Sequence, residues 1–263
     1  PLEVVLTREI IKVQSVTGRV EGDFGYLRVS TFNENTGREL SEAIAKIKAQ
    51  KPGVKGYVLD LRNNGGGLLN AAIDVSDAFL ERGEIVSQRG RKPEQIQRYS
   101  AKPGDLTGGL PVVVLVNYGS ASASEIVAGA LKDHERATIV GLTSFGKGSV
   151  QTILPLPVEG GIRMTTALYY APNGNTIQAR GVAPDIFLSP SKEIKQRRES
   201  DLPGALPAVG KEKWKAKNRP TVPEDACPPV GEKEDRQLGC ALAFLHAGST
   251  KNFLAMIDGR PRI

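Results

Sequence analysis

The chain has 263 residues, enough to bury a sizeable core in one large domain or in a domain with an appendage. Hydrophobic residues make up 40% and charged residues 24%, values typical of a soluble globular protein, and no apolar run approaches the roughly 18 residues of a membrane span. The net charge of +6 is concentrated in residues 190–220, with nine Lys or Arg against four Asp or Glu. Because this Lys- and Pro-rich segment lacks interleaved aromatic residues, we expect a solvated surface segment and no nucleic-acid partner.

The start of the chain and its two cysteines leave the cellular compartment open. Residues 2–7 alternate like a strand, without the basic stretch and apolar core of a signal peptide, so we expect the chain to begin inside a longer protein. Cys227 and Cys240 lack the histidine spacing of a zinc site. One disulfide and two free thiols are both compatible with the sequence.

In chain order, the hydrophobic patterns predict a series of strand–helix units. Strands are predicted over 24–32, 56–61, 111–116, 137–140 and 149–154, and helices over 36–50, 68–81, 122–132 and 237–246. A hairpin-like turn is predicted around 172–174, and residues 190–236 show no clear pattern. The run at 111–116 is apolar throughout, as in strands buried on both faces of a parallel sheet. We therefore predict an α/β fold with a parallel sheet and crossover helices.

Three loops rich in Gly or Ser follow predicted strands, at 63–67, 119–125 and 143–148. Because right-handed crossovers place every strand-to-helix loop at the carboxyl edge of a parallel sheet, we expect the three loops to meet. The second and third loops carry the only obvious candidates for a nucleophile and a base. The candidate site therefore lies at this edge of the sheet.

Ser122 opens the helix predicted at 122–132, where the helix dipole and unpaired N–H groups favour an alkoxide or a tetrahedral oxyanion. The same residue also has a structural explanation. Ser122 and Glu125 form the S-x-x-E pattern of a capping box, and a serine before a helix is usually a cap. Taken alone, this motif favours the cap.

A serine nucleophile needs a base, and the two histidines are poor candidates. His134 lies twelve residues after Ser122, or about 18 Å along a helix, which is beyond hydrogen-bond reach. His246 follows the irregular tail, and no motif supplies a carboxylate to orient it.

Lys147 is the better candidate for the base. Gly146 and Gly148 flank it and let its amine enter a crowded site, where burial would keep the amine neutral and able to accept a proton. Gln151 falls on the same face of the following strand and is predicted to orient the amine. The structural alternative is a surface lysine in a flexible loop.

The triple glycine at 65–67 can direct backbone N–H groups toward a carbonyl oxygen without obstruction by side chains. We predict that the N–H groups of Gly66 and Ala123 form an oxyanion hole. In isolation, such a glycine motif is more often only a turn.

Residues 141–147 also match G-x-x-x-x-G-K, the phosphate-binding loop of nucleotide-binding proteins. The match fails at Gly148, which stands where a Ser or Thr should ligate magnesium. The alternating run at 149–154 also predicts a strand where that motif needs a helix. A nucleotide-binding enzyme is therefore the weaker hypothesis.

Four motifs occur together: D-L-R-N-N-G-G-G at 60–67, G-S-A-S-A-S-E at 119–125, F-G-K-G at 145–148 and G-V-A-P-D at 181–185. This combination, over about residues 1–190, resembles the carboxy-terminal processing peptidases. The resemblance extends to the 25-residue spacing from Ser122 to Lys147 and the four-residue step to Gln151, which match the family's catalytic Ser, Lys and Gln. It therefore outweighs the interpretation of Ser122 as a cap alone.

The resemblance implies a crotonase-like α/β core and a serine endopeptidase that works through an acyl-enzyme, without a metal or other cofactor. It implies extracytoplasmic protein or peptide substrates that are cleaved near their C-termini. It also places the protein in the bacterial periplasm or cell envelope, where Cys227 and Cys240 can be oxidised.

The resemblance also implies a PDZ domain before the core, a domain missing from this sequence and of which residues 2–6 are expected to be the last strand. We expect a lead-in at 1–23, a Ser/Lys protease core at 24–190, and a basic, Pro-rich extension with a terminal helix at 191–263. Three roles stay open for the extension: formation of a homo-oligomer, attachment to cell-envelope partners, or none in catalysis. A catalytically inactive peptide-binding scaffold of the same fold is the main alternative to the peptidase.

Overall fold

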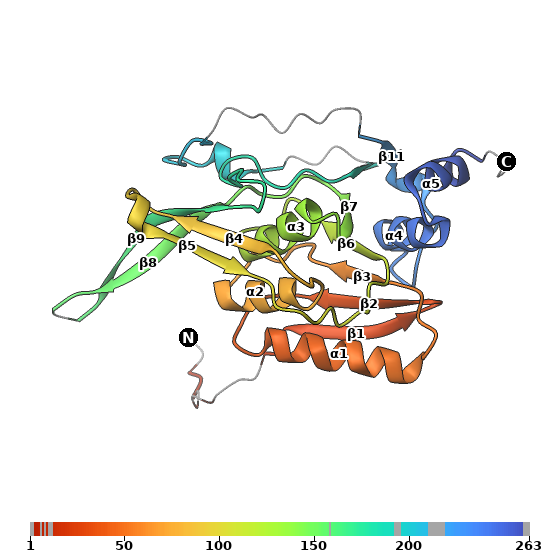
Figure 1. The fold of residues 1–263 in the computed structure, drawn as a ribbon, viewed down its shortest axis with the longest axis horizontal. Coiled ribbons are helices and arrows are strands. Elements are labelled where there is room, and N and C mark those ends of the chain that lie inside the picture. Colours follow the sequence, from red (N-terminus) through yellow and green to blue (C-terminus); the bar gives the residue numbers. More distant parts are fainter. Residues whose placement is uncertain are drawn as a thin grey trace.

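A mostly parallel seven-stranded sheet forms the centre of the protein (Figure 1). The computed structural model describes residues 3–5, 7, 9, 13–157, 159–191, 196–209 and 219–259. In spatial order the strands are β1 (Val16–Glu21), β2 (Phe24–Val29), β3 (Tyr57–Asp60), β6 (Val112–Val116), β7 (Ala137–Gly141), β10 (Ile186–Ser189) and β11 (Thr221–Pro223). Among the described strands of this sheet, β1 alone runs antiparallel to its neighbour. The predicted α/β class with a parallel sheet is confirmed, and the finer crotonase-like assignment stays a prediction.

Helices pack on both faces of this sheet. They are α1 (Thr36–Gln50), α2 (Leu69–Asp77), α3 (Ala123–Asp133), α4 (Arg236–Ala247) and α5 (Thr250–Ile257). Val112 and Val114 of β6 share a buried cluster with α1, α2 and α3, whereas Val113 and Leu115 share another with α4 and α5. Because side chains alternate across a strand, this arrangement explains why the run at 111–116 is apolar throughout. Within the described ranges, no helix has both the length and the apolar character needed to cross a bilayer.

A second sheet of four antiparallel strands ends in a long hairpin that extends away from the rest of the protein (Figure 1). Its strands in spatial order are β5 (Ile96–Ser100), β4 (Glu84–Arg89), β9 (Gly161–Tyr170) and β8 (Ser149–Pro155). The sequence patterns predict β8 but not the other three strands. Nearly all of β5 and the outer half of β9 are exposed, so these segments lack the alternation of buried and exposed residues that identifies a strand.

Segments outside the predicted core contribute both edges of the main sheet. The lead-in predicted at 1–23 supplies β1, and the extension predicted at 191–263 supplies β11, which pairs with β10. The strand predicted at 2–6 lies partly outside the described residues, and Glu3, Val4 and Val5 are not in a strand. Much of the basic segment 190–220 also lies outside them. The terminal helix is confirmed as α4, and α5 is an addition that the sequence did not predict.

Cys227 and Cys240 form a disulfide that ties the segment before α4 to the helix itself. Of the two states that the sequence left open, the structure has the oxidised one. Both residues are buried in the cluster between α4, α5 and the sheet.

Removing this disulfide is expected to lower the free energy of unfolding by about 2–4 kcal/mol, because the cross-link closes a loop in the unfolded chain and so reduces the entropy of that state. The two cysteines are 13 residues apart. The measurement is chemical denaturation of the wild type and of the Cys227→Ser/Cys240→Ser variant, each with and without reductant. Reductant should bring the wild-type midpoint to that of the variant and leave the variant unchanged. Equal midpoints for oxidised wild type and variant would show that the cross-link does not stabilise the fold.

Candidate active site

The three loops predicted to meet are joined by direct hydrogen bonds. We call them the glycine loop (63–67), the Ser122 loop (119–125) and the Lys147 loop (143–148). The Asn64 carbonyl oxygen of the glycine loop accepts the Ala121 N–H at 3.0 Å. The Ser120 carbonyl oxygen accepts the Phe145 N–H, also at 3.0 Å. The loops follow the neighbouring parallel strands β3, β6 and β7, which confirms the prediction from topology.

The three serines of the Ser122 loop differ in what their hydroxyls do. Ser120 and Ser124 are fully buried, and their hydroxyls donate at 2.8 Å to the carbonyl oxygens of Leu61 and Asn64. Ser122 is half-buried, and its hydroxyl makes no capping hydrogen bond to α3. Its backbone has φ of 56° and ψ of −112°, a strained conformation for a residue with a side chain. Ser122 is therefore the one serine of this loop whose hydroxyl does not hold the loop to a neighbouring carbonyl.

The two predicted oxyanion donors are adjacent but not equivalent. A Cβ on Gly66 would lie 2.9 Å from the Ser122 Cβ and 3.0 Å from the Ala123 nitrogen, so only glycine fits this position, where φ is 103°. The Gly66 N–H donates to Asn64 Oδ1 at 2.9 Å. No acceptor for the Ala123 N–H lies within the described part of the chain. In this structure the Ala123 N–H is thus the available donor beside Ser122.

Residues 146–148 of the Lys147 loop are held through their backbone N–H groups. The N–H groups of Gly146 and Lys147 donate to the Glu125 carboxylate at 2.7 and 2.9 Å, and the Gly148 N–H donates to Gln178 Oε1 at 3.0 Å. The Lys147 side chain is half-buried, and its amine has no ion pair or hydrogen bond to any residue that the structure describes. The loop leads directly into β8, which rules out the helix that a phosphate-binding loop requires.

Glu125 joins the Ser122 and Lys147 loops. It is fully buried, and its Oε2 accepts the backbone N–H of Ser122 at 2.8 Å and that of Lys147 at 2.9 Å. Its Oε1 accepts the Ser144 hydroxyl at 2.5 Å. Burial raises the pKa of Glu125 to about 7, against the opposing effect of these hydrogen bonds. The sequence motif assigned Glu125 to helix capping only, since nothing local indicates that its carboxylate reaches a loop some twenty residues away.

Residues 23–188 match the sequence family described as Peptidase family S41. The chain belongs to this family. It is 50% identical over 252 residues to a carboxy-terminal-processing protease of Bartonella bacilliformis, covering 95% of this chain and 58% of that protein. It is 41% identical over 190 residues to a carboxyl-terminal-processing protease of Synechocystis sp., covering 70% of this chain and 44% of that protein. The resemblance inferred from the four motifs is confirmed.

Among solved structures, the photosystem II D1 C-terminal processing protease matches this S41 chain with a TM-score of 0.61 and 39% identity. The match covers 70% of this chain and 50% of that one. The S41 chain thus spans about half the length of the relatives it matches. These relatives are named for C-terminal processing, and the family to which they and this chain belong is one of serine-type peptidases.

The remaining predicted candidates make other contacts. The Gln151 amide donates to Thr165 Oγ1 on β9 at 2.5 Å rather than to Lys147, next to an irregularity in the β8–β9 register. His134 forms the C-cap of α3. The ring of His246 on α4 packs edge-on against the first phenylalanine of β2, with a centroid distance of 4.7 Å. In this conformation neither histidine is part of the loop cluster of the S41 chain.

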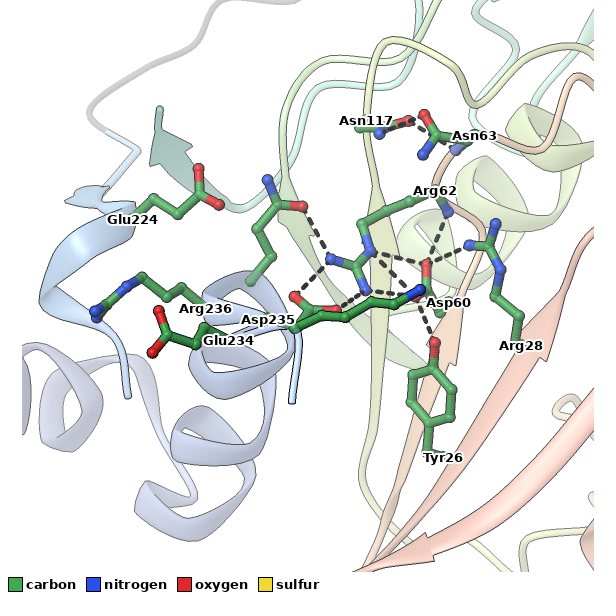
Figure 2. Close-up of a pocket in the computed structure, with 12 residues that line it drawn as sticks. Tyr26, Arg28, Asp60, Arg62, Asn63, Asn117, Glu224, Glu234, Asp235 and Arg236 are labelled. Atoms are coloured by element: carbon green, nitrogen blue, oxygen red, sulfur yellow. Dashed lines mark hydrogen bonds and ion pairs between the residues drawn. The ribbon is translucent and has the colours of Figure 1, made fainter. Parts of the chain in front are cut away.

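Arg62, next to the glycine loop, lies between two carboxylates (Figure 2). Its guanidinium contacts Asp60 at 2.6 Å and Asp235, the N-cap of α4, at 2.7 Å. Asp60 also accepts hydrogen bonds from Tyr26 at 2.8 Å and Arg28 at 2.9 Å. Burial beside Asp60 raises the pKa of Tyr26 to about 12, so its phenol remains a donor. This network links the C-terminal extension to the start of the glycine loop.

Proposed function

We propose that this chain is the catalytic part of a serine endopeptidase that cleaves protein substrates near their C-termini. The observation that carries the proposal is the contrast within one loop. The hydroxyls of Ser120 and Ser124 are buried and hydrogen-bonded, whereas Ser122 is half-buried and its hydroxyl has no hydrogen bond to a residue that the structure describes. One Glu125 oxygen accepts the backbone N–H groups of both Ser122 and Lys147, so the distance between their nitrogens cannot exceed the summed lengths of the two hydrogen bonds. This proximity supports a Ser/Lys pair.

In the proposed reaction, the Ser122 Oγ attacks the carbonyl carbon of the scissile peptide bond while the neutral Lys147 amine takes its proton. The carbonyl oxygen becomes an oxyanion that accepts the Ala123 N–H, near the positive end of α3. The Lys147 ammonium then protonates the leaving amine, which leaves an ester on Ser122. Water, deprotonated by Lys147, hydrolyses the ester and restores the free serine. Gly66 gives the substrate carbonyl access to this position, and Gln151 remains a predicted partner of Lys147.

The proposed substrates are extracytoplasmic proteins or peptides, and the proposed location is the bacterial periplasm or cell envelope. The Cys227–Cys240 disulfide supports an oxidising compartment. The names of the relatives support processing near the C-terminus. For the extension we propose a role in homo-oligomer formation or in binding to envelope partners.

The test is covalent labelling with a fluorophosphonate, followed by mapping of the modified peptide. We expect one adduct, on Ser122, and cleavage of an unstructured peptide that ceases in the Ser122→Ala variant. The Ser120→Ala and Ser124→Ala variants should still react, with unfolding free energies lower by about 1 kcal/mol because each loses a buried hydrogen bond. Intact-peptide binding without an adduct or turnover would favour the inactive scaffold instead.

A further inference from the structure

A short segment of the extension packs against the Lys147 loop. We call residues 196–206 the strap; it contains a 3₁₀ turn at Glu199–Asp201. The Glu199 N–H donates to the Phe145 carbonyl oxygen at 3.1 Å, two residues before Lys147. Glu199 is buried, with 9% of its surface exposed. The strap therefore contacts the candidate site directly. It lies outside residues 23–188, which match the S41 family.

Gln178 bridges the strap and the Lys147 loop. Its side chain is fully buried, and its Oε1 accepts the Gly148 N–H at 3.0 Å. Its Nε2 donates to the Leu206 carbonyl oxygen at 3.0 Å and lies 3.5 Å from a carboxylate oxygen of Glu199. The backbones of residues 148 and 178 lie so close that residue 148 must be glycine, since a Cβ there would lie 2.5 Å from the Gln178 backbone nitrogen. The oxygen and the NH₂ group of the Gln178 amide are thus both hydrogen-bonded, to two segments that are distant in sequence.

We infer that Gln178 is a positioning residue for Lys147 and that it makes the strap part of the catalytic scaffold. The inference rests on the proposed role of Lys147 as base. Glu125 fixes the N–H groups before and at Lys147, and Gln178 fixes the N–H group after it. An apolar side chain would fill the same space but would leave the buried Gly148 N–H unpaired and would lose the bond to the Leu206 carbonyl. The Lys147 backbone would then be held on one side only, and a shift of about 1 Å is enough to slow a reaction a hundredfold.

The Gln178→Met variant tests this role, because it keeps the volume of the side chain and removes its hydrogen bonds. We expect kcat and the rate of Ser122 labelling to fall together by about tenfold or more, with KM within about twofold of the wild type. The matched control is Ser76→Ala on α2, which removes another fully buried hydrogen bond, to the Ala72 carbonyl at 2.8 Å. Ser76→Ala should retain wild-type kcat.

A second pair of variants provides a rescue. Gln178→Glu keeps the acceptor for Gly148 but loses the donor to Leu206 and places a carboxylate beside that of Glu199. Adding Glu199→Gln restores a donor–acceptor pair between positions 178 and 199, in which residue 199 now donates and residue 178 accepts. We expect the single variant to lose more than about tenfold in kcat and the double variant to recover at least about threefold.

Wild-type kcat in Gln178→Met, or no recovery in the double variant, would overturn the positioning role. Absence of labelling and cleavage in the wild type would instead refute the proposed peptidase itself.

Discussion

Replacing Lys147 by arginine is expected to reduce kcat/KM by about 10²- to 10⁴-fold, because a guanidinium keeps its proton and cannot act as a general base. The substitution preserves the positive charge, so it separates proton transfer from electrostatic attraction. The loop itself should stay in place, since Glu125 and Gln178 hold it through backbone N–H groups that the substitution does not alter. The measurement is steady-state cleavage of an unstructured peptide, with labelling of Ser122 as a second readout.

The matched control is Lys55→Arg, at an exposed lysine that pairs with Asp23 at 2.8 Å. This exchange should leave kcat/KM unchanged, because a surface ion pair tolerates either cation. Near-normal activity of the Lys147→Arg enzyme would remove Lys147 as the base of the reaction.

The elements that the sequence predicts well are those with one or two continuous buried faces. The helix at 36–50 has the predicted bounds because Leu40, Ile44 and Ile47 repeat on one buried stripe. The parallel strands β2, β3, β6 and β7 were predicted from their hydrophobic patterns, and their order along the chain places the three loops together. The parallel strands β10 and β11 were not predicted. Of the second sheet only β8 was predicted. Its hairpin with β9 is largely exposed, and the β4–β9 pairing that joins the two halves of the sheet spans a long sequence separation.

The candidate site shows the same division. The Ser, Lys and glycine positions were identified from motifs, whereas the residues that hold them were not. Glu125 and Gln178 act on backbone groups 22 and 30 residues away, and no local periodicity encodes such a contact. The alternation that predicts Gln151 on the Lys147 face of the strand gives no indication of the cross-strand hydrogen bond from its amide to Thr165. In the candidate site, the tertiary hydrogen bonds are what the sequence patterns could not supply.

Replacing Glu125 by glutamine is expected to lower kcat and the rate of Ser122 labelling by about 10²-fold, because it releases both loops at once. One carboxylate oxygen accepts the N–H groups of Ser122 and Lys147, and the other accepts the Gly146 N–H and the Ser144 hydroxyl. An amide has one acceptor oxygen only, so in either orientation its NH₂ group faces a backbone N–H donor.

Glu39→Gln on α1 is the matched control for this substitution. Its carboxylate also accepts three hydrogen bonds, from Ser15 and Val16, but contacts neither loop. It should lose stability without losing activity. Equal activity losses in the two variants would mean that Glu125 acts only through general stability.

The glutamine variant also isolates the titration of Glu125. Burial raises the pKa of Glu125 from 4.5 to about 7, against the opposing effect of its hydrogen bonds. The folded protein therefore holds this proton more tightly than the unfolded chain, so the stability it contributes is fully present below pH 4.5 and is lost as the pH rises through about 7. The difference in unfolding free energy between wild type and Glu125→Gln should accordingly fall by about 3 kcal/mol as the pH is raised across that range. Denaturant titrations at several pH values measure this difference, and a value independent of pH would contradict a buried carboxyl group that binds its proton near neutrality.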